Sequence, residues 1–244
     1  MNNINIKRLL HTVLPFMIMN MVQRSILLIF QSSPAQDIVS VCAFIAACTA
    51  GIFAFTRKTY TDESEGTLPL IPRSYPISAI LTVSACASMV ALMYAASLIG
   101  GTAESEIVSF TAVGILSTLL IHPILEELVF RKLFYGELRL MNRIFGCAAQ
   151  TLMFAILHST VDGMVYALCS GLILALLYEH TGRILPCIIA HIFINLRSLL
   201  CLTVLADLGD LTRGLDIALI AAGMIGFCIY LRMRAETPKE PEHD

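Results

Sequence analysis

Long apolar stretches separated by short polar connections run through the whole chain. Their hydropathy predicts membrane-spanning helices near residues 9–30, 37–56, 77–100, 107–125, 145–158, 161–179, 184–204 and 214–231. The fourth is expected to continue as a helix to about residue 139, because helix formers persist there and apolar residues still recur at helical spacing. The predicted fold class is all-α, a polytopic membrane bundle of about eight transmembrane helices.

The composition supports a membrane protein without a separate soluble domain. The chain of 244 residues is 57% hydrophobic and 14% charged, whereas soluble domains usually carry about 25% charged residues. Its eight cysteines are scattered without a CxxC pair, which favours packing roles over disulfides or a zinc knuckle. The formal charge of −2 argues against a nucleic-acid partner. We expect a single domain over residues 1–244, embedded in the lipid bilayer.

Lysine and arginine residues predict the orientation of the bundle. Cytoplasmic connections should hold the positive charge, and alternate ends of the predicted spans do so. The charges lie at Lys7, Arg8, Arg57, Lys58, Arg73, Arg131, Lys132, Arg139, Arg143, Arg183, Arg232, Arg234 and Lys239. The connections between those ends contain only Arg213. We expect a multi-pass protein of the plasma membrane with both termini in the cytoplasm and residues 232–244 as a cytoplasmic tail.

Three polar clusters interrupt or border the apolar spans. They are Glu126, Glu127 and Arg131 in EELVFR, His158 at the end of FAILH, and His191 with Asn195 in HIFIN. An ionisable side chain in hydrocarbon costs roughly 2.5–3.5 kcal/mol on insertion scales, so several of them indicate a shared polar site. Carboxylates, imidazoles and a carboxamide are groups that activate water and hold an oxyanion. This combination predicts a hydrolase within the membrane.

The two adjacent glutamates are expected to have different roles. Neighbouring residues of a helix point about 100° apart, so both cannot face one centre equally. Glu127 and Arg131 have the i, i+4 spacing of an ion pair along one helix face. We therefore assign this pair to support and Glu126 to catalysis. The alternative is an ordinary cytoplasmic helix end whose charges lie among the headgroups.

The histidines and the asparagine have spacings that allow them to meet Glu126. His158 and Glu126 lie symmetrically about Asn142, where a helical hairpin would turn, so both fall at similar depth. His191 and Asn195 share one helix face, although this pair would also serve a purely structural hydrogen bond between helices. One difficulty is that His158 falls near the outer end of its span, whereas His191 is nearer the cytoplasmic end. Strong tilt, a short sixth span or a cytoplasmic hairpin that extends well past the headgroups would reconcile the two depths.

As a set, the three clusters resemble the EExxxR, FxxxH and HxxxN motifs of the CPBP intramembrane proteases. This group includes the CAAX-processing prenyl endopeptidases and bacterial Abi proteins, and the similarity covers about residues 114–200. His122 and Lys132 depart from the residues that are common in the family beside the site. The resemblance implies hydrolysis of a peptide or protein substrate in the membrane, in which Glu126 and His158 activate water while His191 and Asn195 stabilise the oxyanion.

Metal dependence and two non-protease functions stay open at this point. Glu126, His158 and His191 would also make a two-histidine, one-glutamate zinc set. Because the HExxH helix of zinc proteases is missing, we favour a reaction without zinc or another cofactor. A noncatalytic scaffold or immunity protein would keep the same fold. A proton-coupled transporter would also place these groups in membrane helices, although the sequence has no internal repeat typical of carriers.

Overall fold

The computed structural model describes residues 6–30, 35–57, 74–98, 111–158, 161–203 and 209–236, and these are helical without any strand. The main helices are α1 (Ile6–Ile29), α2 (Gln36–Arg57), α3 (Tyr75–Leu98), α7 (Arg143–Ile156), α8 (Val161–Thr181), α9 (Ile184–Thr203) and α10 (Gly209–Glu236). The predicted all-α bundle is confirmed. Helix α10 extends into the predicted tail as far as Glu236, while residues 237–244 and the expected start of the fourth span at 107–110 lie outside the described residues.

The fourth span is one unbroken helix from Ala112 to Leu138, as the sequence predicted. It changes winding along its length, through α4 (Ala112–Leu116), η1 (Ser117–Ile121), α5 (His122–Glu127), η2 (Leu128–Tyr135) and α6 (Gly136–Leu138). The two η segments are π-helical, a winding that is rare and is frequent at functional sites. They flank α5, which carries both glutamates at its end.

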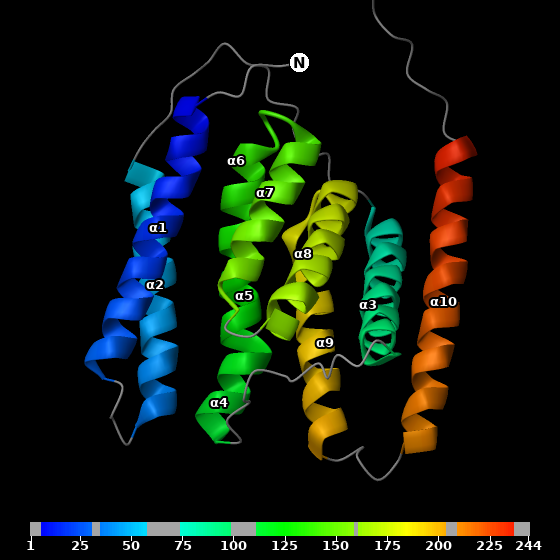
Figure 1. Ribbon diagram of the computed structural model, residues 1–244. Helices are drawn as coiled ribbons and strands as arrows, with labels where there is room; N and C mark the ends of the chain where they lie inside the picture. Colours follow the sequence, from blue (N-terminus) through cyan, green and yellow to red (C-terminus); the bar gives the residue numbers. More distant parts are fainter. Residues whose placement is uncertain are drawn as a thin grey trace, which may run out of the picture.

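Two helix pairs enclose the central part of the bundle. Figure 1 shows α1 beside α2 on one flank and α3 beside α10 on the other, and each pair is closely packed. The fourth span, α7, α8 and α9 lie between them. One apolar core lies toward α1 and α2 and includes Phe130 and Phe134, and the other lies toward α3 and α10 and includes Tyr135. The helix that carries Glu126 and Glu127 therefore separates two cores.

Helix α7 is too short to cross a bilayer. Its 14 residues rise about 21 Å, whereas the hydrocarbon core is about 30 Å thick. In Figure 1 the lower ends of α7 and α8 stop well above the lower ends of α4 and α9. His158 lies two residues beyond α7, and its ring and the His191 ring both lie beside the Phe154 ring, so the two histidines are at a similar level in the bundle. Six other helices in the described part are long and apolar enough to span a membrane, consistent with an integral membrane protein.

A tight hairpin joins the fourth span to α7 and sets their offset. Asn142 caps α7, its side-chain oxygen accepting a hydrogen bond of 2.9 Å from the Phe145 amide. A Cβ added to Gly146 would lie 2.6 Å from the backbone nitrogen of Arg139, so only glycine allows this approach. The Arg139 guanidinium donates two hydrogen bonds to Glu179 of α8, at 2.9 and 3.0 Å. These bonds hold the pKa of Arg139 above its ordinary value.

Candidate active site

Glu127 and Arg131 form an ion pair sealed inside the bundle. Both side chains are 0% exposed, and Glu127 Oε2 lies 3.1 Å from Arg131 Nε, as expected from the i, i+4 spacing. Arg131 Nη2 also donates to the Gly171 carbonyl at 3.5 Å, and its guanidinium carbon lies 4.7 Å from the centre of the Phe154 ring. The pair is thus fixed by contacts from both α7 and α8.

The same carboxylate holds His191 of α9. Glu127 Oε1 lies 2.8 Å from His191 Nδ1. Because a carboxylate is a hydrogen-bond acceptor, Nδ1 is the donor of this bond, and in the neutral form of the imidazole Nε2 is then an acceptor. Arg131, Glu127 and His191 therefore form a chain in which each side chain orients the next.

Glu126 lies on the other side of the His191 ring. Its Oε2 atom is 3.7 Å from His191 Nε2, which is longer than a direct hydrogen bond. A water molecule bound to both atoms fits such a separation. The side chains of Glu126 and His191 are 17% and 11% exposed, whereas Glu127 is fully buried. The accessible side of the cluster is accordingly the side of Glu126.

Asn195, one turn beyond His191, bonds to the backbone of the fourth span. Its Nδ2 atom donates to the Thr118 carbonyl at 2.9 Å. In the π-helical turn the His122 amide bonds to Ser117, and the next residue, Pro123, has no N–H. The Thr118 carbonyl therefore lacks its usual donors in the helix, and Asn195 supplies one. Since the amide has two hydrogens, the second stays available to another acceptor.

His158 is placed beside this cluster and not in direct contact with it. Its Nδ1 atom lies 3.2 Å from the Phe154 carbonyl, so Nδ1 is the donor, and in the neutral form of the ring Nε2 is then an acceptor. The Phe154 ring lies 5.1 Å from the His158 ring and 6.2 Å from the His191 ring, edge-on to each. Within the described residues, His158 forms no hydrogen bond or ion pair with Glu126 or His191. The structure thus brings Glu126, Glu127, Arg131 and His191 into one cluster, with Asn195 adjacent and His158 across Phe154.

The structure adds residues to the site that the sequence had not singled out. Gln150 of α7 is 0% exposed, and its Nε2 atom donates to Thr151 Oγ1 at 2.6 Å and to the Gly171 carbonyl at 3.5 Å. The Gly171 carbonyl thereby accepts hydrogen bonds from both Gln150 and Arg131. The sequence feature that could have identified Gln150 is its polar carboxamide within the otherwise apolar run CAAQTLMFAILH. His122, the departure noted from the family pattern, packs against Phe44 with 4.3 Å between ring centres.

The alternative zinc set of Glu126, His158 and His191 is not grouped as a metal site among the described residues. In the described part of the chain, no three His, Cys, Asp or Glu side chains are grouped closely enough to hold a metal ion. Glu126 and His191 are neighbours, but His158 does not complete the set. The preference for a metal-free reaction stays a prediction.

Comparison with known proteins gives a match to the same region. Residues 108–197 match the family described as Type II CAAX prenyl endopeptidase Rce1-like. A curated relative from Bacillus subtilis (strain 168), named "Putative membrane peptidase YdiL", is 30% identical over 91 residues, which cover 37% of this chain and 37% of the relative. No solved structure matches the chain significantly. The resemblance to the CPBP intramembrane proteases is thereby confirmed, and over residues 108–197 this chain is similar to the Rce1-like CAAX prenyl endopeptidases.

Proposed function

We propose that this protein is an intramembrane endopeptidase that hydrolyses a peptide bond of a membrane-associated or lipidated peptide. The observation that carries the proposal is the 3.7 Å gap between Glu126 Oε2 and His191 Nε2, backed by the buried Glu127–Arg131 pair. Ionisable side chains inside a bilayer cost free energy, and the proteins that keep them usually use them in a functional site. The family match supports a protease in general.

Glu126 is the proposed general base. A water bound between Glu126 and the Nε2 lone pair of His191 attacks the carbonyl carbon of the scissile bond, and Glu126 takes its proton. The same carboxyl then gives the proton to the leaving nitrogen as the carbon–nitrogen bond breaks, which yields a carboxylic acid and an amine; the acid then passes its proton to the amine. His158, whose Nε2 atom is an acceptor, is proposed to assist in holding the water.

Glu127 and Arg131 are proposed as positioning residues. The Glu127 carboxylate fixes the tautomer and the orientation of His191 as the aspartate does in a Ser-His-Asp triad. Arg131 in turn compensates the buried carboxylate. Neither residue needs to touch the substrate for this role.

Asn195 is the proposed oxyanion donor, while His191 holds the attacking water through its Nε2 atom. The Thr118 carbonyl orients the Asn195 amide so that one N–H is used and the other is left for the tetrahedral intermediate. One such donor is typically worth about 3 kcal/mol in the transition state, or 10²–10³-fold in rate. The proposed reaction uses no metal and no cofactor.

The experiment that tests the proposal compares cleavage products in membranes from cells that express the full chain or its Glu126→Gln variant. Peptides with new termini are identified by mass spectrometry. Glu126→Gln keeps the shape of the side chain and removes the base, so we expect the products to disappear while the thermal unfolding midpoint of the purified variant stays near that of the wild type. Glu137→Gln, the same change further along this span, should leave the products unchanged.

Two results would contradict the proposal. One is an identical peptide profile with wild type and Glu126→Gln, which a noncatalytic scaffold or a transporter would give. The other is stoichiometric zinc in the purified protein together with loss of cleavage after chelation, which would replace the metal-free reaction.

A further inference from the structure

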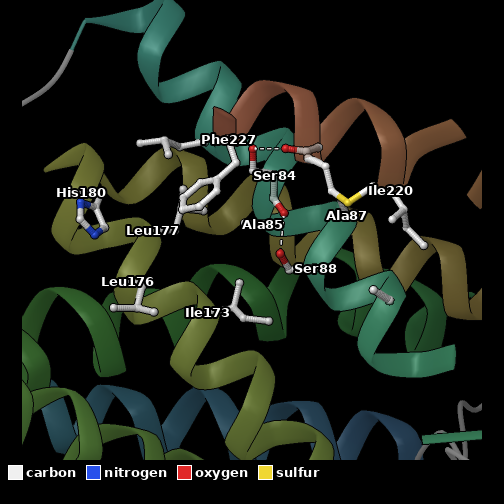
Figure 2. A pocket seen from close by; sticks show the side chains of 14 residues that line it. Ser84, Ala85, Ala87, Ser88, Ile173, Leu176, Leu177, His180, Ile220 and Phe227 are labelled. Atoms are coloured by element: carbon white, nitrogen blue, oxygen red, sulfur yellow. Dashed lines mark hydrogen bonds between the residues drawn. The ribbon is translucent and has the colours of Figure 1, made fainter. Parts of the chain in front are cut away.

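An apolar cleft lies between α3, α8 and α10, away from the candidate active site. Its volume is about 450 Å³, within the range of ligand pockets. Ser84, Ser88 and alanines of α3 form one wall, Ile173, Leu176 and Leu177 of α8 another, and Ile220, Met224 and Phe227 of α10 the third (Figure 2). Leu176, Met224 and Phe227 are 46%, 60% and 47% exposed, so the cleft opens on the surface of the bundle between α8 and α10.

Helix α8 separates this cleft from the candidate active site. Gly171 faces Arg131 and receives its hydrogen bond. Ile173, Leu176 and His180 follow at helical angles of roughly 140–180° from Gly171, which places them on the opposite face of α8. The cleft is therefore separate from the position where the peptide bond would be cut.

Polar and basic side chains lie at and just beyond one end of the cleft. His180 lines that end, and its Nδ1 atom lies 3.2 Å from the Tyr230 hydroxyl of α10 (Figure 2 shows His180 at the edge of the cleft). Three residues further on, the Arg183 guanidinium carbon lies 4.3 Å from the centre of the Tyr75 ring at the start of α3. Tyr75 precedes Leu81, a residue of the cleft wall, by six residues, or about 9 Å along α3. This end is the one predicted to face the cytoplasm.

We propose that the cleft binds one acyl chain of an anionic phospholipid, with the phosphate against His180 and Arg183. The apolar walls suit a hydrocarbon chain that enters sideways from the bilayer. The aromatic and basic residues at one end match the level and the charge of an anionic headgroup, which is enriched in the cytoplasmic leaflet and binds basic pockets between transmembrane helices. A neutral or zwitterionic lipid would fill the apolar cleft equally well, but its headgroup would bind the basic residues more weakly.

The experiment measures lipids that stay bound to the full chain when it is released from nanodiscs containing equal amounts of phosphatidylglycerol and phosphatidylcholine. Native mass spectrometry counts each kind. We expect phosphatidylglycerol to be retained over phosphatidylcholine, by about fivefold for each basic residue in contact with the phosphate. The double variant His180→Gln/Arg183→Gln should still retain lipid but lose this preference.

A pair of matched variants tests the cleft itself. Ser88 is exposed on the cleft wall, so Ser88→Phe fills the space without disturbing the core and should remove the retained lipid. Leu172→Phe adds a ring at an exposed position of α8 outside the cleft and should retain lipid as the wild type does. Glu126→Gln should also bind lipid normally, because the site is independent of catalysis.

Three outcomes would overturn the proposal. They are equal retention of both lipids by the wild type, undiminished retention by Ser88→Phe, and displacement of the lipid by a farnesylated peptide at equimolar concentration. The last would assign the cleft to a substrate tail instead.

Discussion

The buried Glu127–Arg131 pair gives the sharpest prediction, because its two single variants and its double variant should behave in opposite ways. We consider Glu127→Gln, Arg131→Met and the combination of the two. Each single change leaves one charge buried without its main partner. The double change leaves two neutral side chains of similar size in the same space.

The expected magnitude follows from the geometry. Two unit charges 3.1 Å apart attract by about 5 kcal/mol at an effective dielectric constant of about 20. Because both side chains are fully buried, removing one partner should cost about 3–5 kcal/mol of the free energy of unfolding. For a chain of this size that corresponds to a fall in melting temperature of roughly 6–20 °C. The double variant should lose much less than the sum of the single variants, with a coupling of at least about 2 kcal/mol.

Catalysis should not follow stability in this series. The double variant recovers folding but has no ionised carboxylate to orient His191 Nδ1. We therefore expect peptide cleavage to be strongly reduced in the two variants that lack the Glu127 carboxylate. Recovery of stability without recovery of cleavage would separate the orienting role of Glu127 from a structural role alone.

The assay is thermal unfolding in detergent, combined with the peptide profile of membranes that express each variant. Lys132→Met is the matched control, since this exposed neighbour has the same charge as Arg131 and should change the free energy of unfolding by less than about 0.5 kcal/mol. Additivity of the two single variants to within about 0.5 kcal/mol would refute the argument. Wild-type cleavage by the stable double variant would refute the orienting role.

Further predictions concern the hairpin, the Arg197–Asp216 ion pair that joins α9 to α10, and the proposed oxyanion donor. Gly146→Ala should destabilise the protein by about 1–3 kcal/mol, since the added Cβ meets the backbone of Arg139 at 2.6 Å; an unchanged melting temperature would contradict this. Asp216→Asn should destabilise by about 3–5 kcal/mol, because its buried carboxylate binds the Arg197 guanidinium; replacing both residues by apolar ones should recover most of the loss, and no recovery would argue against an ion-pair effect. Asn195→Ala should lower the cleavage rate 10²–10³-fold in a folded protein; wild-type cleavage would exclude it as a donor.

The sequence determined which segments are helices and which residues are candidates for the chemistry. Apolar run length and residue spacing are local properties, so the spans from hydropathy agree with the described helices to within a few residues at most ends. The i, i+4 spacing likewise predicted the contact between Glu127 and Arg131, because both residues lie on one helix. The predicted continuation of the fourth span to about residue 139 also rested on local spacing, and the helix ends at Leu138.

Contacts between helices needed the tertiary structure. No local pattern indicates that His191 lies between the two glutamates, touching Glu127 at 2.8 Å and facing Glu126 at 3.7 Å. The division of the neighbours also came only from the structure, with His158 across Phe154 and Asn195 on the Thr118 carbonyl. The sequence had grouped these side chains by their chemistry, by their spacing along the helices and by their resemblance to family motifs.

The physical reason is that helix formation depends on neighbours along the chain, whereas a site between helices depends on how far each helix is rotated and shifted against the others. Here the π-helical turns, the short α7 and the close approach at Gly146 set those rotations and shifts. Each is a consequence of packing. The sequence by itself therefore determined the helices and the candidate catalytic groups, and only the packed bundle decided which of those groups meet.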